Sequence, residues 1–219
     1  MNSRQRGLVR LKQLRIETDS AENELEKHRG RFVKLARNDS APRAVSAFNL
    51  FQTPPDIAAM MAGRLLEHFG NLDGLRLLEP SAGLGRLYSA VRSASDSAEI
   101  VLVEQSADCC RELYKQTESD RRARLIQSDF LAVDFARAGG LFDAVIANPP
   151  FKQGRDVKHI NHALELVKPG GLVVSLCFDG VKQNRNLRPC CDTWEVLPDG
   201  SFKSEGTGAS VALLSIVRK

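Results

Sequence analysis

Apolar residues recur along most of the chain at two alternating spacings. Residues 55–69 carry Ile57, Met60, Met61 and Leu65 at a helical spacing, and short apolar runs of strand length follow. Strands are expected over residues 75–80, 99–105, 123–130, 141–151 and 171–178, with helices over residues 87–93, 107–117 and 156–167. Apolar strands that alternate with helices predict an α/β fold, a doubly wound and mostly parallel sheet covered on both faces.

The two ends of the chain show other patterns. Residues 194–198 and 209–219 are expected to close the sheet as a hairpin, which makes seven strands in all. Residues 3–37 carry two apolar stripes at helical spacing, and residues 38–55 have the small, polar and proline composition of a connector. We therefore predict a helical N-terminal extension over residues 1–45 and one α/β domain over residues 46–219.

Composition adds an asymmetry of charge. The 42% hydrophobic and 26% charged content is that of a folded globular chain. The net charge is +4, yet residues 1–45 carry +5 and the remainder −1. The extension is either a phosphate-binding arm or a solvated helical face. No apolar run reaches the roughly 20 residues of a membrane span, and the N-terminus lacks a secretory apolar segment, so we expect a cytoplasmic protein without a membrane partner.

Cysteine and histidine positions do not suggest a metal site. Five cysteines is an odd number, and two adjacent pairs do not match the C-x₂-C spacing of zinc ligands. They are Cys109, Cys110, Cys177, Cys190 and Cys191. His159 and His162 stand three residues apart, but no third ligand is evident. We expect reduced thiols and no bound metal.

The expected strand ends carry unusual chemistry, and ligands bind at the carboxyl ends of strands in this architecture. The first strand ends in EPSAGLGR, where Gly83 and Gly85 allow a close backbone approach to a ligand. The third glycine of a dinucleotide fingerprint is replaced by Tyr88, which favours a nucleoside site over a pyrophosphate site. A structural tight turn explains the two glycines equally well.

Acidic residues end the next two strands. Glu104 follows the glycine loop by about 20 residues, the position of an acid that accepts hydrogen bonds from ribose hydroxyls. Asp129 and Phe130 suit an adenine, with the carboxylate on the exocyclic amine and the ring packed on the base. The alternatives are an exposed carboxylate for Glu104, and a turn aspartate followed by a core phenylalanine.

The most specific feature is the run Asn148-Pro149-Pro150-Phe151 at the end of the fourth strand. Two prolines stiffen the backbone and remove donors, which leaves carbonyl acceptors. The Asn148 side chain adds another acceptor, so the segment can hold an amino group, while Phe151 can stack on a planar base.

Taken together, these motifs resemble the S-adenosylmethionine-dependent amino-group methyltransferases, and most closely the gamma-type N6-adenine DNA methyltransferases of phage and mobile elements. The resemblance runs from about Phe51 to Lys219. It includes an F-x-T-P element in Phe51-Gln52-Thr53-Pro54, the glycine loop, the two acidic positions and the N-P-P-F tetrapeptide. It implies a Rossmann-like class I methyltransferase fold.

The resemblance also implies a set of site residues. The catalytic set is Asn148, Pro149, Pro150 and Phe151. The S-adenosylmethionine-binding set is Phe51, Thr53, Pro54, Glu79, Ser81, Gly83, Gly85, Glu104, Asp129, Phe130 and Asn148. Asn148 and the Pro149 carbonyl would hold the target amine of an adenine flipped out of its stack, and the amine would attack the sulfonium methyl in line, without a metal or covalent intermediate.

Two segments depart from the larger enzymes of this family. The 68 residues after Phe151 are mostly needed to finish the sheet, so we expect no large C-terminal recognition domain. Residues 179–193 are short for the usual crossover helix, and the bases Lys182, Arg185 and Arg188 there either contact phosphates or belong to a solvated loop. Phe202 is either a wall of the base pocket or an aromatic at a hairpin tip.

The preferred function is therefore methylation of the N6 amine of adenine in DNA. The same chemistry on RNA is the first alternative, since RNA enzymes also carry N-P-P-[FY]. Methylation of a glutamine amide in a protein is another, and a non-catalytic binding module is the last. The sequence leaves the target site and the oligomeric state open.

Overall fold

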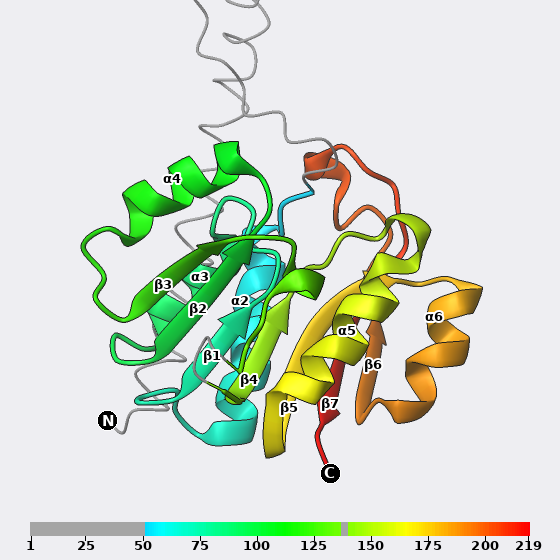
Figure 1. Cartoon of the computed structure of the whole chain (residues 1–219). Helices are drawn as coiled ribbons and strands as arrows, with labels where there is room; N and C mark the ends of the chain where they lie inside the picture. The colour runs from blue at the N-terminus through cyan, green and yellow to red at the C-terminus, as the bar shows by residue number, and fades with distance from the viewer. Residues whose placement is uncertain (1–50, 137–139) are drawn as a thin grey trace, which may run out of the picture.

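The computed structural model describes residues 51–136 and 140–219 and is built on one seven-stranded sheet (Figure 1). The strand order is β3-β2-β1-β4-β5-β7-β6, and the strands pair in parallel except for β7, which runs antiparallel to both β5 and β6. The strands are β1 (Arg76–Glu79), β2 (Glu99–Glu104), β3 (Ala123–Gln127), β4 (Phe142–Ala147), β5 (Val167–Phe178), β6 (Thr193–Val196) and β7 (Val211–Val217). The predicted doubly wound, mostly parallel sheet is confirmed.

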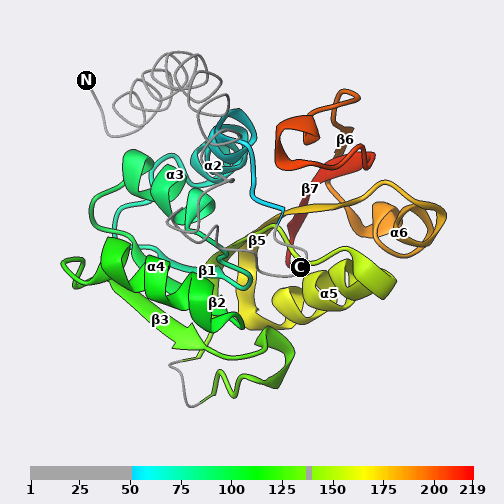
Figure 2. The ribbon, with the colours of Figure 1, turned by 90° about the horizontal axis from the view of Figure 1, so that it is seen from above.

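Five α-helices of the described residues cover the two faces of the sheet (Figure 2). They are α2 (Pro55–Phe69), α3 (Arg86–Ala94), α4 (Ala107–Thr117), α5 (Arg155–Leu166) and α6 (Val181–Asn186). The first three lie on one face, and α5 and α6 on the other. Four of them match the expected helices to within a residue or so at each end. The predicted extension over residues 1–45, with its helices and basic charge, and nearly all of the connector lie outside the described residues.

Alternating strand residues build a separate core on each face. Leu77 and Ile100 pack with the helices α2 and α3, whereas their neighbours Leu78 and Val101 pack in a second cluster with residues of α5. Successive side chains of a strand point to opposite faces, so a continuous apolar run such as IVLV (residues 100–103) serves both cores. This packing fixes the sheet as a rigid platform whose carboxyl edge carries the loops.

Strand β5 begins earlier than the predicted residue 171. Val167 pairs with Phe142 of β4, the next pairs resume at Leu172, and the segment between them is a bulge. Two contacts hold this bulge. The Lys168 ammonium donates to the Asp143 carboxylate at 2.7 Å, and the Gly170 amide donates to the Arg218 carbonyl at 2.7 Å. The Pro-Gly signal therefore ends the helix, as expected, without ending the pairing.

Strand β3 ends earlier than predicted, at Gln127, and β4 ends at Ala147, where the segment expected over residues 141–151 passes into a loop. The Asp129 carboxylate accepts the Leu131 amide at 3.2 Å and turns the chain into a 3₁₀ turn, η1 (Phe130–Ala132). After β4, two consecutive prolines lack the N–H groups that strand pairing needs. Further single turns are η2 (Lys152–Gly154), η3 (Arg188–Cys190) and η4 (Lys203–Glu205). The residues with candidate chemistry thus lie in loops just beyond the strands.

No helix among the described residues combines the length and the apolar content that crossing a bilayer requires.

We expect Gly171→Ala to destabilise the fold by about 1–3 kcal/mol, because a Cβ at this position would collide with the Asp143 carbonyl oxygen across the β4–β5 pair. The measurement is the free energy of unfolding from urea titration. The matched control is Gly63→Ala in the middle of α2, where a Cβ meets nothing within 4 Å and alanine should stabilise by about 0.5–1 kcal/mol. Equal effects of the two substitutions would contradict the packing assigned to Gly171.

Candidate active site

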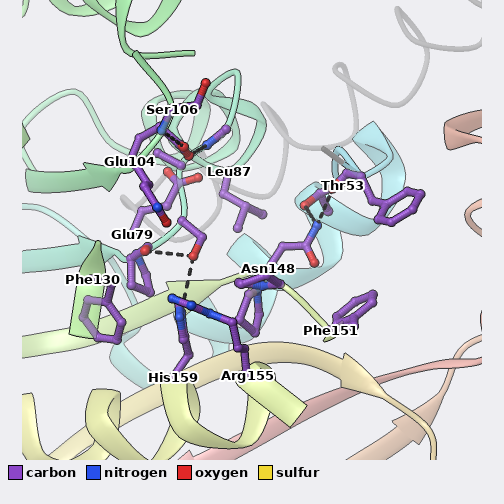
Figure 3. A pocket seen from close by; sticks show the side chains of 18 of the residues that line it. Thr53, Glu79, Leu87, Glu104, Ser106, Phe130, Asn148, Phe151, Arg155 and His159 are labelled. Atoms are coloured by element: carbon purple, nitrogen blue, oxygen red, sulfur yellow. Dashed lines mark hydrogen bonds between the residues drawn. The ribbon is translucent and has the colours of Figure 1, made fainter. Parts of the chain in front are cut away.

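A cavity of about 620 Å³ opens at the carboxyl ends of β1, β2 and β4 (Figure 3). This volume lies in the range of small-molecule sites. Most of the residues expected from the sequence line it. They are Phe51, Thr53, Glu79, Ser81, Gly83, Glu104, Asp129, Phe130, Asn148, Pro149, Pro150 and Phe151. Segments that are far apart in the chain therefore meet in one concave site.

Two residues expected to bind the cofactor, Pro54 and Gly85, lie outside the lining. Pro54 is buried just before α2, and its carbonyl accepts the Ala58 amide at 2.9 Å. Gly85 begins α3 with a left-handed φ of 80°, and a Cβ there would lie 2.8 Å from the Gln116 amide oxygen. Each residue thus shapes the backbone of an adjacent loop, and the predicted contact of both with the cofactor stays a prediction.

Glu79 presents a buried carboxyl to the cavity. It is 1% exposed, and its Oε2 has no hydrogen-bond partner within the described part of the chain. Burial raises the pKa of Glu79 well above its usual value, a backbone hydrogen bond from Tyr88 opposes this, and the nearby Glu104 adds to the rise. A buried acceptor without a donor is costly, so this position suits a ligand that brings a positively charged donor.

Glu104 organises the glycine loop from the end of β2. Its Oε2 accepts the Gly83 amide at 2.8 Å, and its Oε1 accepts the Ser106 amide at 2.7 Å. A carboxylate has about four lone-pair sites, so each oxygen retains capacity for one more donor. The geometry is compatible with the ribose-hydroxyl role expected for Glu104.

Asp129 has a partner that the sequence did not reveal. Arg155 donates from one terminal nitrogen to both Asp129 oxygens at 2.9 Å. Although partial burial acts to raise it, the pKa of Asp129 is lowered by hydrogen bonds from Arg155 and from the Leu131 amide. An arginine in the first turn of a helix is disfavoured by the helix dipole, and this was the one signal in the sequence that Arg155 needs a carboxylate.

The rings of Phe130 and His159 lie next to each other in the lining of the cavity. Phe130 is 2% exposed, and its ring centroid lies 5.2 Å from that of His159 and 4.9 Å from that of His162. Phe130 is thus both a core residue and a cavity residue, which joins the two alternatives drawn from the sequence.

His159 is a cavity residue that the sequence prediction missed. Burial, with Arg155 adding to it, lowers the pKa of His159 to about 4, so the ring is neutral near pH 7. Its Nδ1 lies 3.4 Å from the Ser81 hydroxyl, and its Nε2 is buried without a partner among the described residues. The signal in the sequence was its place on the buried stripe of α5 with Asp156, Ile160 and Ala163.

Asn148 is held by the segment that precedes α2. Its Nδ2 donates to the Phe51 carbonyl at 3.0 Å and to the Thr53 hydroxyl at 3.1 Å, as Figure 3 shows. The assignment of nitrogen and oxygen in this amide follows from these two acceptors. Both amide hydrogens are thereby used, and within the described chain no hydrogen bond engages the Asn148 Oδ1.

The structure also answers questions that the sequence left open about residues 179–193 and Phe202. Residues 179–193 contain α6 and η3, so the crossover helix is present although short. Phe202 is 1% exposed and lies in the core with α2, outside the cavity lining, so it is neither a pocket wall nor an exposed hairpin tip. Across residues 51–136 and 140–219, no group of three or more metal-type side chains is found, and all five cysteines are free thiols.

Replacing Glu79 by glutamine should change how the stability of the ligand-free protein depends on pH. A carboxyl whose pKa is raised by folding is protonated in both states at low pH and weakens folding as pH rises above its unfolded pKa. Between about pH 5 and the raised pKa, the wild type should therefore lose up to about 1.4 kcal/mol per pH unit relative to Glu79→Gln. Urea unfolding of both proteins from pH 5 to 8 measures this difference, and parallel pH curves would contradict a buried, protonated Glu79.

Curated relatives match part of the chain. It is 26% identical over 133 residues to an rRNA N(6)-adenosine-methyltransferase, metl-5, of Caenorhabditis elegans, which covers 58% of this chain and 62% of the relative. It is 32% identical over 105 residues to the modification methylase CviBIII of Paramecium bursaria Chlorella virus NC1A, covering 47% of this chain and 26% of the relative. The chain thus spans less than two thirds of the length of both relatives.

Solved structures share the fold. The methyltransferase subunit of a type I restriction-modification system from Streptococcus thermophilus superposes with a TM-score of 0.67 at 17% identity, over 77% of this chain and 45% of that one. At this identity the likeness concerns the fold alone, and it confirms the Rossmann-like class I architecture.

The family comparison agrees with the motifs and with the site. The model of the methyltransferase small domain matches residues 55–197, a range that includes the glycine loop, both acidic strand ends and the N-P-P-F segment. This match confirms the resemblance to methyltransferases drawn from the sequence, with S-adenosylmethionine as the cofactor. The chain belongs to the methyltransferase small domain family.

Proposed function

We propose that this chain transfers a methyl group from S-adenosylmethionine to the N6 amine of adenine in a nucleic acid, with DNA as the first substrate. The observation that carries the proposal is the fixed amide of Asn148. Because its two hydrogens are used by Phe51 and Thr53, it offers the cavity only an acceptor. An amino group has hydrogens to donate, whereas a carbonyl or a ring nitrogen without hydrogen does not.

The neighbouring residues support an amino group as the acceptor of the methyl. Pro149 and Pro150 have no N–H, so this part of the loop presents carbonyl oxygens. Asn148 Oδ1 and the Pro149 carbonyl would each accept one hydrogen of the amine and leave its lone pair directed at the methyl group. Phe151 lines the cavity and is half-buried, which suits stacking on the base that carries the amine.

The cavity also suits the methyl donor. S-adenosylmethionine, when bound, supplies an electrophilic methyl group on a sulfonium. The unpartnered Oε2 of Glu79 would accept a hydrogen bond from the ammonium group in the methionine part of the cofactor. The positive charge of this ammonium would favour the ionised form of the Glu79 carboxyl. Glu104 would accept from the ribose hydroxyls, and Asp129, together with Phe130, would hold the adenine. The catalytic contribution of these residues is positioning and a fixed electrostatic environment.

Both kinds of nucleic acid have support among the relatives. Identity is higher with a modification methylase, at 32%, and the F-x-T-P element of the sequence favours the DNA branch. The RNA alternative remains because the match to an rRNA N6-adenosine methyltransferase extends over more of the chain, 133 residues against 105. One assay with both substrates decides between them.

The test is to incubate the protein with S-adenosylmethionine labelled in its methyl group and, in parallel, with unmethylated duplex DNA, total RNA and a protein extract. We expect N6-methyladenine in DNA after digestion to nucleosides. Asn148→Ala should abolish transfer while cofactor affinity, measured by calorimetry, falls much less. Label in RNA alone would replace the DNA substrate, and label in protein alone would refute a nucleic-acid substrate.

A second expectation concerns Thr53, whose hydroxyl fixes the Asn148 amide. Thr53→Val keeps the shape but removes one of the two acceptors that hold the amide. The amide is then held by the Phe51 carbonyl alone, and kcat should fall about 10- to 100-fold, a loss of about 1.4–2.7 kcal/mol in transition-state stabilisation. KM for the nucleic acid should change little, because binding outside the base pocket is untouched. Thr53→Ser keeps the hydroxyl and should restore kcat, whereas equal losses in Val and Ser variants would show that Thr53 acts only by packing.

A further inference from the structure

A group of exposed residues lies beside the cavity, at the end of β5 and on the helix α6 that follows it. It consists of Phe178 at the end of β5, with Val181, Lys182 and Arg185 on α6, and we call it the α6 ridge. Phe178 is 39% exposed and Val181 is 87% exposed, so both present apolar surface to solvent. Lys182 and Arg185 are exposed as well. Apolar and cationic surface thus occur together on one short segment.

The ridge adjoins the catalytic loop. Strands β4 and β5 are paired as far as Ala147 and Ser175, so the N-P-P-F segment leaves the sheet beside the strand that ends in Phe178. The Lys182 ammonium occupies the space that a Cβ on Gly154 would need, next to the turn that carries the cavity residues Lys152 and Gln153. Substrate held at the N-P-P-F segment therefore has this ridge as a neighbour.

The ridge is rigidly tied to the start of α5 by Asp156. This carboxylate is fully buried, and its Oδ2 accepts the Phe178 amide at 3.1 Å and the Gln183 side-chain amide at 2.8 Å. Its Oδ1 accepts the Val157 amide at 2.9 Å. Because Gln183 belongs to α6 and Asp156 follows the catalytic loop by five residues, the ridge and the loop share one anchor.

The charge of the ridge is not balanced locally. In the described part of the chain, no carboxylate pairs with Lys182 or Arg185. The nearby Asp179 is engaged by the Asn184 side-chain amide at 2.7 Å. Unpaired cations beside an exposed aromatic ring are the surface features that bind single-stranded nucleic acids, where phosphates meet the cations and an unstacked base meets the ring.

We propose that the α6 ridge binds the unpaired strand that flanks the target nucleotide, with Lys182 and Arg185 on its phosphates and Phe178 stacked on one base. This inference rests on the proposed function and assigns the surface that holds its substrate. Contacts of this kind read the backbone and one base face, so they confer affinity rather than sequence preference. The ridge accordingly favours a strand that is single-stranded or locally opened around the adenine.

The experiment measures binding of fluorescent 12-nucleotide single strands containing adenine, as DNA and as RNA, and of the matching duplexes, by anisotropy at several salt concentrations. The double variant Lys182→Gln/Arg185→Gln should lower the slope of log affinity against log salt by about 1.4, the value for two phosphate contacts on a single strand. Arg121→Gln is the matched control, since Arg121 is an exposed arginine at the amino-terminal end of β3, on the opposite edge of the sheet.

The stacking contact has its own variants. Phe178→Ala should weaken single-strand affinity about 5- to 150-fold, and Phe178→Trp should retain it. Tyr114→Ala, which removes an aromatic ring that is 61% exposed on α4, should have no effect. Thermal melting and cofactor affinity, which should be unchanged in all variants, show that the fold is intact.

Several results would overturn the proposal. A salt slope in the double variant equal to that of the wild type would refute the proposed phosphate contacts. Unchanged binding by Phe178→Ala would refute the proposed stacking. An equal loss on duplex and on single strand would refute the preference for an unpaired strand. Methyl transfer by the wild type, measured in parallel, separates the two hypotheses, because failure of the ridge with transfer intact leaves the proposed function standing.

Discussion

Carboxylates withdrawn from water require donors, and this requirement arranges the whole carboxyl edge of the sheet. The Glu104 carboxylate accepts hydrogen bonds from the amides of Gly83 and Ser106 and so fixes the glycine loop against β2. The Asp129 carboxylate accepts hydrogen bonds from Arg155. This interaction ties the end of β3 to the helix that follows the N-P-P-F segment. Glu79 is the exception, because its Oε2 has no donor among the described residues. Of these three carboxylates, only Glu79 thus keeps an oxygen without a donor in the described part of the chain, and it lies where a charged ligand is expected.

Most of the fold was predictable because the sheet is buried on both faces. Continuous apolar runs and Pro-Gly signals located the strands and helices, and parallel strands must bring their carboxyl ends to one edge. The bulge at Lys168–Gly171 was not predictable, since it depends on a tertiary ion pair with Asp143. Phe202 was misjudged because it is buried in a core cluster whose other residues, those of α2 among them, come from distant parts of the chain.

Most residues of the candidate site could be predicted from the sequence, but the hydrogen bonds between them could not. Twelve of the expected residues line one cavity, since motif spacing identifies chemistry at strand ends. The partners Arg155 and His159 were missed because a hydrogen bond between distant residues leaves almost no periodic signal. Thr53 shows the same limit. The motif suggested contact with the cofactor, and Thr53 does line the cavity, but the bond between its hydroxyl and the Asn148 amide left no signal in the sequence.

The loop after β4 is held from two directions, and this has a consequence for catalysis by positioning. Phe51 and Thr53 fix Asn148 from the side of α2, while Asp156 fixes the start of α5 to the α6 ridge. Between these anchors Gln153 adopts a left-handed φ of 56°, which costs energy in a residue with a Cβ and persists only when its surroundings enforce it. A loop constrained at both ends loses little further freedom when a base enters. The cost of orienting the amine is therefore met largely in folding, before any substrate binds.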